Sequence, residues 1–201
     1  MEKTLEEAKE LLNSILLTDN TPILFLGAGF SCGASNKANA MDGCKLKEYI
    51  YDTLAKDKIG PEDEEEVKGY DLRKLSDEIY RIYHGKTELY NLLHEMYINT
   101  RPAEFHDYLV KYPWKNIYTV QGENIVVQNK QRLISNSKST QLFKLHGCVR
   151  NMEEGVIFSE DEYTELITRK LDAKLNKFSN DIQRDNVIFI GARMDEPDIK
   201  Y

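Results

Sequence analysis

The chain has 201 residues, 41% hydrophobic and 30% charged, which is enough for one sizeable α/β domain with a buried core. No apolar run approaches the roughly 20 residues that span a bilayer, and the charged start of the chain lacks the pattern of a secretory signal. The formal net charge of -7 argues against a nucleic-acid-binding surface. We therefore expect a cytoplasmic protein with no membrane segment and no direct nucleic-acid partner.

The N-terminal part of the sequence predicts a helix, a strand and a second helix. A capping-box pattern at residues 4–7 precedes apolar residues at helical spacing and predicts a helix over 5–17. The continuous apolar run 23–26 is typical of a strand buried on both faces of a parallel sheet. Another helical pattern begins beyond Gly43, and the polar, acidic stretch 56–69 is interpreted as a solvated loop.

The middle of the sequence predicts more helices. Residues 71–97 carry two helical patterns divided near Gly85, and Pro102 opens a further short helix that runs to Val110. We interpret this region, over about 45–111, as a helical insertion beside the sheet.

The C-terminal half returns to short apolar strands. Residues 114–120 and 141–147 each predict a strand, and 155–159 predicts a short extended piece. A long amphipathic helix with apolar positions between 163 and 178 follows, and 186–192 is another buried strand that ends in glycine.

Helices between apolar strands that end in glycine predict an α/β fold, with a Rossmann-like, doubly wound, mostly parallel sheet and a small helical insertion. We assign residues 1–201 to a single domain. The sequence stops ten residues after Gly191, with no helix or strand to follow. A parallel sheet that stops on a strand is usually unfinished, so we expect this domain to be the N-terminal part of a longer chain.

A glycine tip follows the first predicted strand. Gly27-Ala28-Gly29 would let a phosphate approach backbone N–H groups, and the N-terminus of a following helix would add a favourable dipole. The third glycine of the GxGxxG pattern is missing, because Cys32 stands there and Gly33 comes one residue later. The tip predicts a nucleotide ligand, and the alternative is a plain tight turn.

Four segments occur together in the order of a known family. They are FLGAGFS (25–31), WKNIYTVQGENIV (114–126), FKLHG (143–147) and VIFIGARMDEPDI (187–199). From Ile23 onward the chain resembles sirtuin-like domains, particularly the NAD-hydrolysing domains of prokaryotic antiphage defence proteins. The resemblance implies a Rossmann-like domain with a smaller helical module and NAD+ as its substrate.

The resemblance implies two catalytic residues. His146 matches the family's catalytic histidine, a residue type that accepts a proton from water or a ribose hydroxyl. Gln121 stands where the family has an asparagine that orients the attacking group, and its extra methylene moves the amide by more than about 1 Å, which can cost 10²-fold. Asn124 is the alternative source of this amide. His106 is interpreted as a structural histidine, which is the more common role for a histidine in a helix.

The resemblance also implies a set of NAD-binding residues. They follow the ends of the predicted strands and comprise Gly27, Ala28, Gly29, Ser31, Thr119, Glu123, Gly191 and Arg193. Glu123 replaces the family's aspartate, and Arg193 puts a cation where the family has a small hydroxyl. Such a cation can pair with a phosphate.

The three cysteines bear on metal binding and on the reaction. Cys32, Cys44 and Cys148 fit neither a disulfide framework nor a CxxC metal knuckle, and we interpret them as reduced thiols. Protein-deacylating sirtuins carry two CxxC pairs between the histidine and the last strand. Four thiolates are needed for that tetrahedral zinc site, so no zinc ribbon forms here and no metal is expected.

The resemblance thus implies an NAD+ hydrolase that cleaves the nicotinamide–ribose bond and serves as the effector of a bacterial antiphage defence system. Such a system implies homo-oligomers and a phage-derived or sensor-protein trigger. The alternative is a catalytically weak module that binds NAD or ADP-ribose, or that drives oligomerisation. A protein deacylase is the third possibility.

Overall fold

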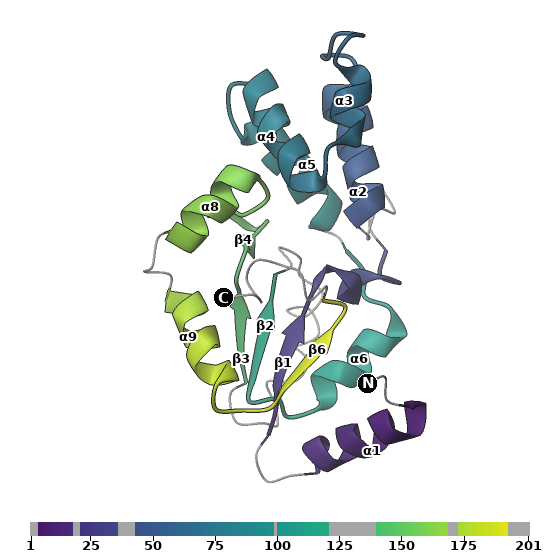
Figure 1. Ribbon diagram of the computed structural model, residues 1–201, viewed down its shortest axis with the longest axis vertical. Helices are drawn as coiled ribbons and strands as arrows, with labels where there is room; N and C mark the ends of the chain where they lie inside the picture. The colour runs from purple at the N-terminus through teal and green to yellow at the C-terminus, as the bar shows by residue number, and fades with distance from the viewer. Residues whose placement is uncertain are drawn as a thin grey trace.

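The computed structural model describes residues 4–17, 21–35, 43–98, 100–120, 140–168 and 173–192. Its central layer is a four-stranded parallel sheet in the order β3-β2-β1-β6 (Figure 1). The strands are β1 (Ile23–Leu26), β2 (Asn116–Thr119), β3 (Gln141–Lys144) and β6 (Val187–Ile190). The order runs outward from β1 in both directions, as in a Rossmann-like fold. The predicted fold class is confirmed.

The central strand β1 is buried because it has a neighbour on each side and helices on both faces. Leu24 and Leu26 belong to one apolar cluster, and Ile23 and Phe25 belong to another. Alternate residues of a strand point to opposite faces, so the sheet separates two cores. Each of these four side chains is at most 1% exposed. This explains why the strand is a continuous apolar run rather than an alternating one.

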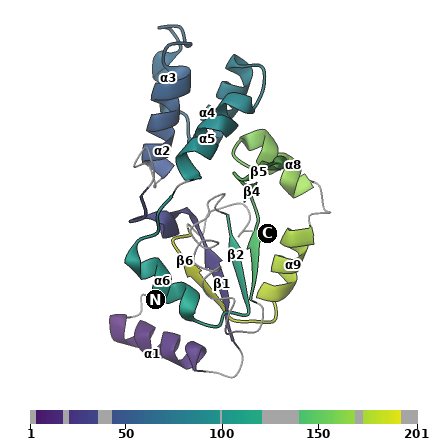
Figure 2. The same cartoon turned by 180° about the vertical axis from the view of Figure 1, so that it is seen from behind.

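Helices cover both faces of the sheet (Figures 1 and 2). On one face lies α9 (Ala173–Ile182), whose Phe178 packs against Phe25 with ring centroids 5.2 Å apart. On the other lies α6 (Glu104–Lys111), with α1 (Leu5–Leu16) beside it near the amino ends of the strands. These helices give the sheet the two apolar coverings that a parallel sheet requires.

Four further helices stand beyond the carboxyl ends of the strands (Figure 1). They are α2 (Gly43–Ile50), which continues into a π-helical segment η2 (Tyr51–Ala55), then α3 (Glu64–Gly69), α4 (Leu72–Ile82) and α5 (Thr87–Tyr97). We call α2, η2, α3, α4 and α5 the helical module. Its apolar face is buried, with Ile50, Ile79 and Leu93 all 0% exposed. The two helices predicted within 71–97 are confirmed.

The predicted loop over 56–69 is partly wrong, because Glu64–Gly69 forms α3. The acidic run, which predicted a solvated loop, places three carboxylates in the first turn of α3. There they stabilise the helix, because they interact favourably with the partial positive charge of its N-terminus. Val67 is 4% exposed and joins the core. One buried residue on a helix this short leaves too little periodicity to detect.

Two predictions in the C-terminal half also need correction. The strand predicted over 141–147 ends at Lys144, and Gly147 instead begins an antiparallel pair, β4 (Gly147–Cys148) with β5 (Asn151–Val156). Gly147 has φ +82°, which turns the backbone away from the parallel sheet. The single long helix consists of two described helices, α8 (Glu160–Thr168) and α9.

Candidate active site

The carboxyl ends of all four parallel strands lie along one edge of the sheet, and each bears a residue predicted for the site. In spatial order these are His146 after β3, Thr119 at the end of β2, Gly27 after β1 and Gly191 after β6. Backbone pairing continues past the strand ends. The Leu145 N–H donates to the Thr119 oxygen (2.8 Å), and the Gly27 N–H donates to the Ile190 oxygen (3.0 Å). Motifs separated by up to 164 residues in the chain therefore share one edge.

The loops after β1 and β6 pack backbone against backbone. The Gly29 N–H donates to the Gly191 oxygen at 2.8 Å, and a Cβ on Gly29 would lie 2.9 Å from that same oxygen. Gly191 has φ +64°, and a Cβ there would overlap the amide nitrogen of Phe30. These glycines are therefore required by the contact between the two loops, a reason that the sequence did not reveal.

Hydrogen bonds within the protein also occupy backbone donors of the glycine tip. The N–H groups of Gly27, Gly29 and Phe30 all donate to carbonyl oxygens within the protein. The tip continues into a 3₁₀ helix, η1 (Ala28–Ser31), whose Ser31 is 0% exposed. The tip lies at the switch point of the sheet between β1 and β6, where Rossmann-like folds bind their ligands.

His106, on α6, is hydrogen-bonded to the loop after β1. It is 0% exposed, its Nδ1 accepts the Ala103 N–H at 2.9 Å, and its Nε2 lies 2.8 Å from the Phe30 oxygen. With Nδ1 as the acceptor, Nε2 carries the proton and donates to Phe30. The ring also meets Phe30 edge to face, with centroids 4.6 Å apart. The structural role predicted for His106 fits these contacts.

His146 is buried, with 5% of its surface exposed, at the turn between β3 and β4. Its carbonyl oxygen accepts the Ile157 N–H at 3.0 Å, which ties the turn to the segment after β5. Its Nδ1 lies 3.2 Å from the phenol oxygen of Tyr163 on α8. The two rings meet edge to face, with centroids 4.9 Å apart. The backbone and the ring of His146 are therefore both held.

Several predicted site residues lie outside the part of the chain that the structure describes. They are Gln121, Glu123 and Arg193, together with the alternative amide Asn124. Among the predicted residues that are described, Thr119 and Ser31 are buried, whereas Ala28 and Gly29 are exposed at the surface of the tip.

Sequence reasoning missed a buried carboxylate next to the site. Glu162 is 7% exposed and lies on the first turn of α8, directly before Tyr163. Its carboxylate accepts hydrogen bonds from Lys86 (2.5 Å), from the phenol of Tyr90 (3.0 Å) and from the Ser159 N–H (3.0 Å). Burial acts to raise the pKa of Glu162, but these charge-assisted and backbone hydrogen bonds hold it below its usual value.

Glu162 joins the helical module to the sheet domain. Lys86 and Tyr90 belong to the start of α5, and Tyr80 of α4 also donates to the carboxylate, at 3.2 Å. Burial and the neighbouring carboxylate raise the pKa of Tyr80, which therefore stays a neutral donor. A glutamate within an amphipathic helix gives no sequence signal of this role, because its partners are 72 to 82 residues away.

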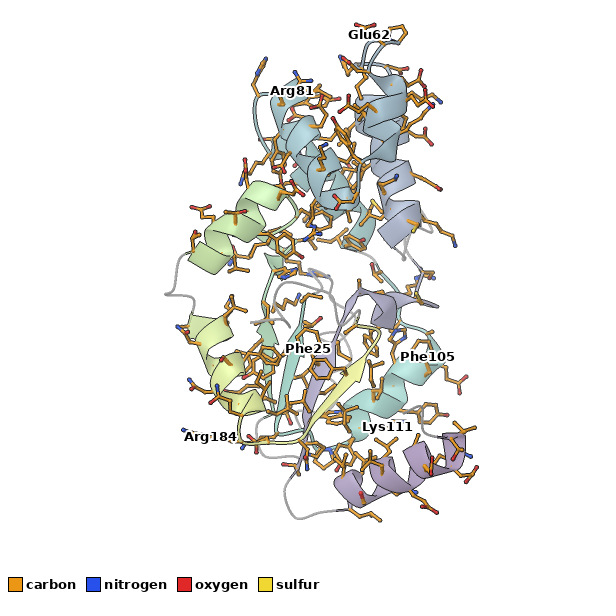
Figure 3. All side chains as sticks on the ribbon, viewed as in Figure 1. Phe25, Glu62, Arg81, Phe105, Lys111 and Arg184 are labelled. Atoms are coloured by element: carbon orange, nitrogen blue, oxygen red, sulfur yellow. The ribbon has the colours of Figure 1, made fainter. Side chains whose placement is uncertain are left out.

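A recess among the described residues lies elsewhere, at the outer end of the helical module. It has a volume of about 200 Å³ and is lined by Asp63, Glu66, Val67, Tyr70, Glu78 and Arg81. Figure 3 shows Arg81 and Glu62 at this outer end, far from Phe25 on β1. Arg81 is paired with Glu78 and the Tyr70 phenol with Glu66, so the lining groups neutralise or bind one another. The candidate site therefore stays at the strand ends.

The described residues contain neither a metal-binding cluster nor a helix able to span a membrane. No group of three or more His, Cys, Asp or Glu side chains gathers there in a way that would hold a metal ion. None of the described helices has both the length and the apolar character needed to cross a membrane.

The fold and the site together define a Rossmann-like α/β domain with a candidate ligand site at the carboxyl edge of a parallel sheet. The sequence matches the family model of the SIR2-like domain over residues 51–201. The chain therefore belongs to the SIR2-like family, whose members use NAD+ as a substrate, and the sirtuin-like resemblance is confirmed. The match includes Thr119, His146 and Gly191 but begins after the glycine tip. A comparison with curated proteins found no match.

Proposed function

We propose that this domain hydrolyses NAD+ at the bond between nicotinamide and ribose. The observation that carries the proposal is the position of His146, buried at the carboxyl edge beside Thr119, on the same edge as the loops after β1 and β6. NAD+ is elongated, so it can extend along this edge from a pyrophosphate near the glycine tip to a nicotinamide ribose near His146. The exposed backbone at Ala28 and Gly29 and the cation of Arg193 would face the phosphates.

The reaction assigns one task to each catalytic residue. His146 accepts a proton from a water molecule as the water oxygen bonds to the anomeric carbon of the ribose. The carbon–nitrogen bond to nicotinamide breaks, and its electron pair leaves with nicotinamide, which becomes neutral. The ribose carries cationic character in the transition state, so nearby oxygens such as that of Thr119, and the carboxylate of Glu123, stabilise it. Gln121, or Asn124 in its place, orients the water.

Water is the favoured acceptor because the chain cannot build the zinc ribbon of protein deacylases. Its three cysteines are too few for a four-thiolate site. In its place, the helical module stands over the carboxyl edge. Within a bacterial cytoplasm, such an activity would deplete NAD+ after infection, as in the antiphage proteins that the chain resembles. A phage-derived or sensor-protein trigger, and assembly into homo-oligomers, complete this proposal.

Nicotinamide release measures the activity directly. We expect His146→Ala to lower the turnover of the assembled, triggered protein by 10²- to 10⁴-fold, the usual contribution of a general base. His94→Ala is the matched control, because His94 lies on α5 and belongs to none of the motifs assigned to the site, so its loss should leave turnover unchanged. Equal turnover in His146→Ala and the parent protein would contradict the assigned role.

The longer amide offers a second test. If Gln121 overreaches the position of the family's asparagine, Gln121→Asn should raise turnover about 10-fold, equivalent to about 1.4 kcal/mol of transition-state stabilisation. His146→Ala in the same chain should cancel the gain. If Gln121→Asn has no effect while Asn124→Ala eliminates turnover, Asn124 is the working amide.

A catalytically weak binding module is the second candidate, favoured by the substitutions at Gln121, Glu123 and Arg193. Calorimetric titration with NAD+ or ADP-ribose separates the two. Both functions predict binding, and only the hydrolase predicts release of nicotinamide. Binding without any release, in every assembly tested, would favour the module.

A further inference from the structure

Tyr163 lies close to the Nδ1 nitrogen of His146. The phenol oxygen lies 3.2 Å from Nδ1, and the edge-to-face contact of the two rings fixes the plane of the imidazole. Tyr163 lies on α8, which follows the β4–β5 pair in the chain, and it is 17 residues after His146. The contact is therefore tertiary rather than a consequence of the local turn.

The direction of this hydrogen bond bears on which imidazole nitrogen can act as a base. A neutral imidazole carries one proton, and only the nitrogen without it can accept another. When Nδ1 holds the proton and donates it to the Tyr163 oxygen, Nε2 keeps its lone pair. The same hydrogen bond persists when Nε2 is protonated, because both nitrogens of an imidazolium are donors. A phenol oxygen can accept this bond and still donate its own proton elsewhere.

We propose that Tyr163 is a positioning residue for His146: its phenol oxygen accepts the Nδ1–H and leaves Nε2 as the basic nitrogen. The inference rests on the proposed function for its catalytic consequence, but the tautomer itself does not depend on activity. Without the phenol oxygen, Nδ1–H loses this acceptor, and the fraction of the neutral imidazole with a basic Nε2 falls.

The position of Tyr163 is itself fixed by its neighbours on α8. Ser159, which is 0% exposed, and Glu162 bond reciprocally at the start of this helix: the Glu162 N–H donates to the Ser159 hydroxyl (3.2 Å), and the Ser159 N–H donates to the Glu162 carboxylate (3.0 Å). This is a capping box, which holds the first turn. The guanidinium of Arg73, on α4, lies over the Tyr163 ring at 5.3 Å.

The arrangement links the helical module to the reacting histidine. Lys86 and Tyr90 hold the Glu162 carboxylate from α5, and the Asp77 carboxylate of α4 accepts the Glu160 N–H at 2.9 Å. Two helices of the module therefore fix the turn that presents Tyr163. Packing alone would be satisfied by a phenylalanine at position 163, whereas orientation of the Nδ1–H requires the oxygen.

The test replaces that oxygen alone. Tyr163→Phe keeps the ring, and we expect kcat for nicotinamide release to fall about 10-fold, part of the 10²- to 10⁴-fold that a general base contributes, while KM for NAD+ stays unchanged. Tyr83→Phe is the matched control, since it removes a hydroxyl that donates to the Leu54 oxygen at 3.1 Å inside the module. An unchanged kcat in Tyr163→Phe, or an equal loss in Tyr83→Phe, would overturn the inference.

A second readout separates this inference from the hydrolase proposal. Long-range ¹H–¹⁵N spectra distinguish the two neutral imidazole tautomers, and the His146 signals are those that disappear in His146→Ala. We expect the parent protein to carry the proton on Nδ1, and Tyr163→Phe to shift signal toward the Nε2–H form. A parent protein with the proton on Nε2 would refute the positioning role. A parent protein with the expected tautomer and no nicotinamide release would refute only the hydrolase.

Discussion

Gly191→Ala is the sharpest test of how the candidate site is built. Gly191 follows β6 with φ +64°, a conformation that residues with a Cβ rarely adopt. The added Cβ would overlap backbone atoms of Gly29 and Phe30 in the loop after β1. Backbone cannot move aside as a flexible side chain can, so the two loops must separate.

The expected cost has three parts. A left-handed conformation costs a residue with a Cβ roughly 1–2 kcal/mol. Steric overlap in a close-packed region typically adds about 1–3 kcal/mol, and loss of the 2.8 Å hydrogen bond between the Gly29 N–H and the Gly191 oxygen adds about 1 kcal/mol. We expect Gly191→Ala to lower the free energy of unfolding by about 3–6 kcal/mol, a large share of the 5–15 kcal/mol typical of a domain.

Urea unfolding measures this loss through a single reporter. Trp114 is the chain's one tryptophan and is 5% exposed just before β2, so its fluorescence reports on the sheet. With a slope of about 2 kcal/mol/M, the midpoint should fall by about 1.5–3 M. Gly69→Ala is the control. It ends α3, and a Cβ there would meet no described atom within 4 Å, so the midpoint should stay level or rise slightly. A Gly191→Ala midpoint within about 0.5 M of the parent value would refute the packing argument.

Three further predictions concern charge, a thiol and metal. The folded-state pKa of Glu162 lies below its unfolded value, so its contribution to stability is complete above the unfolded pKa and is lost as pH falls through the folded one. Glu162→Gln should therefore lower the free energy of unfolding at pH 7 by about 2–3 kcal/mol, because the charged bond to Lys86 is lost. It should also flatten the decline of the urea midpoint between pH 6 and pH 3, and an equally steep decline would contradict this prediction. Burial acts to raise the pKa of the Cys148 thiol. The ammonium of Lys144, whose Nζ lies 3.0 Å from Sγ, outweighs this effect together with backbone N–H groups, so the pKa of the thiol lies below its usual value. Lys144→Met should slow the alkylation of Cys148 by iodoacetamide at pH 7 several-fold. Mass spectrometry measures the rate, with the exposed Cys32 as the internal reference. An unchanged rate would exclude an effect of the lysine on the thiol. Treatment with EDTA should change neither the unfolding midpoint nor nicotinamide release, and a stoichiometric metal found by elemental analysis would contradict this.

Local sequence patterns predicted most of the fold. The capping box at Thr4, the apolar run 23–26 and the helical spacing within 71–97 each identify an element from residues close together in the chain. Short elements were harder to detect. The six-residue helix α3 buries one residue, and the two-residue strand β4 is defined by its partner β5 rather than by its own composition.

The sequence by itself determined the fold class, the family and the position of His146 close after a strand, because these depend on local periodicity and on motifs of a few residues. Only the tertiary structure decided that residues 29 and 191 must be glycines. A Cβ at either position would overlap backbone atoms of the loop that carries the other. The tertiary structure also decided that Tyr163 would meet the ring of His146, and that Glu162 would join the module to α8. Contacts of this kind connect residues 17 to 162 positions apart, and they exist only after the strands have aligned their carboxyl ends.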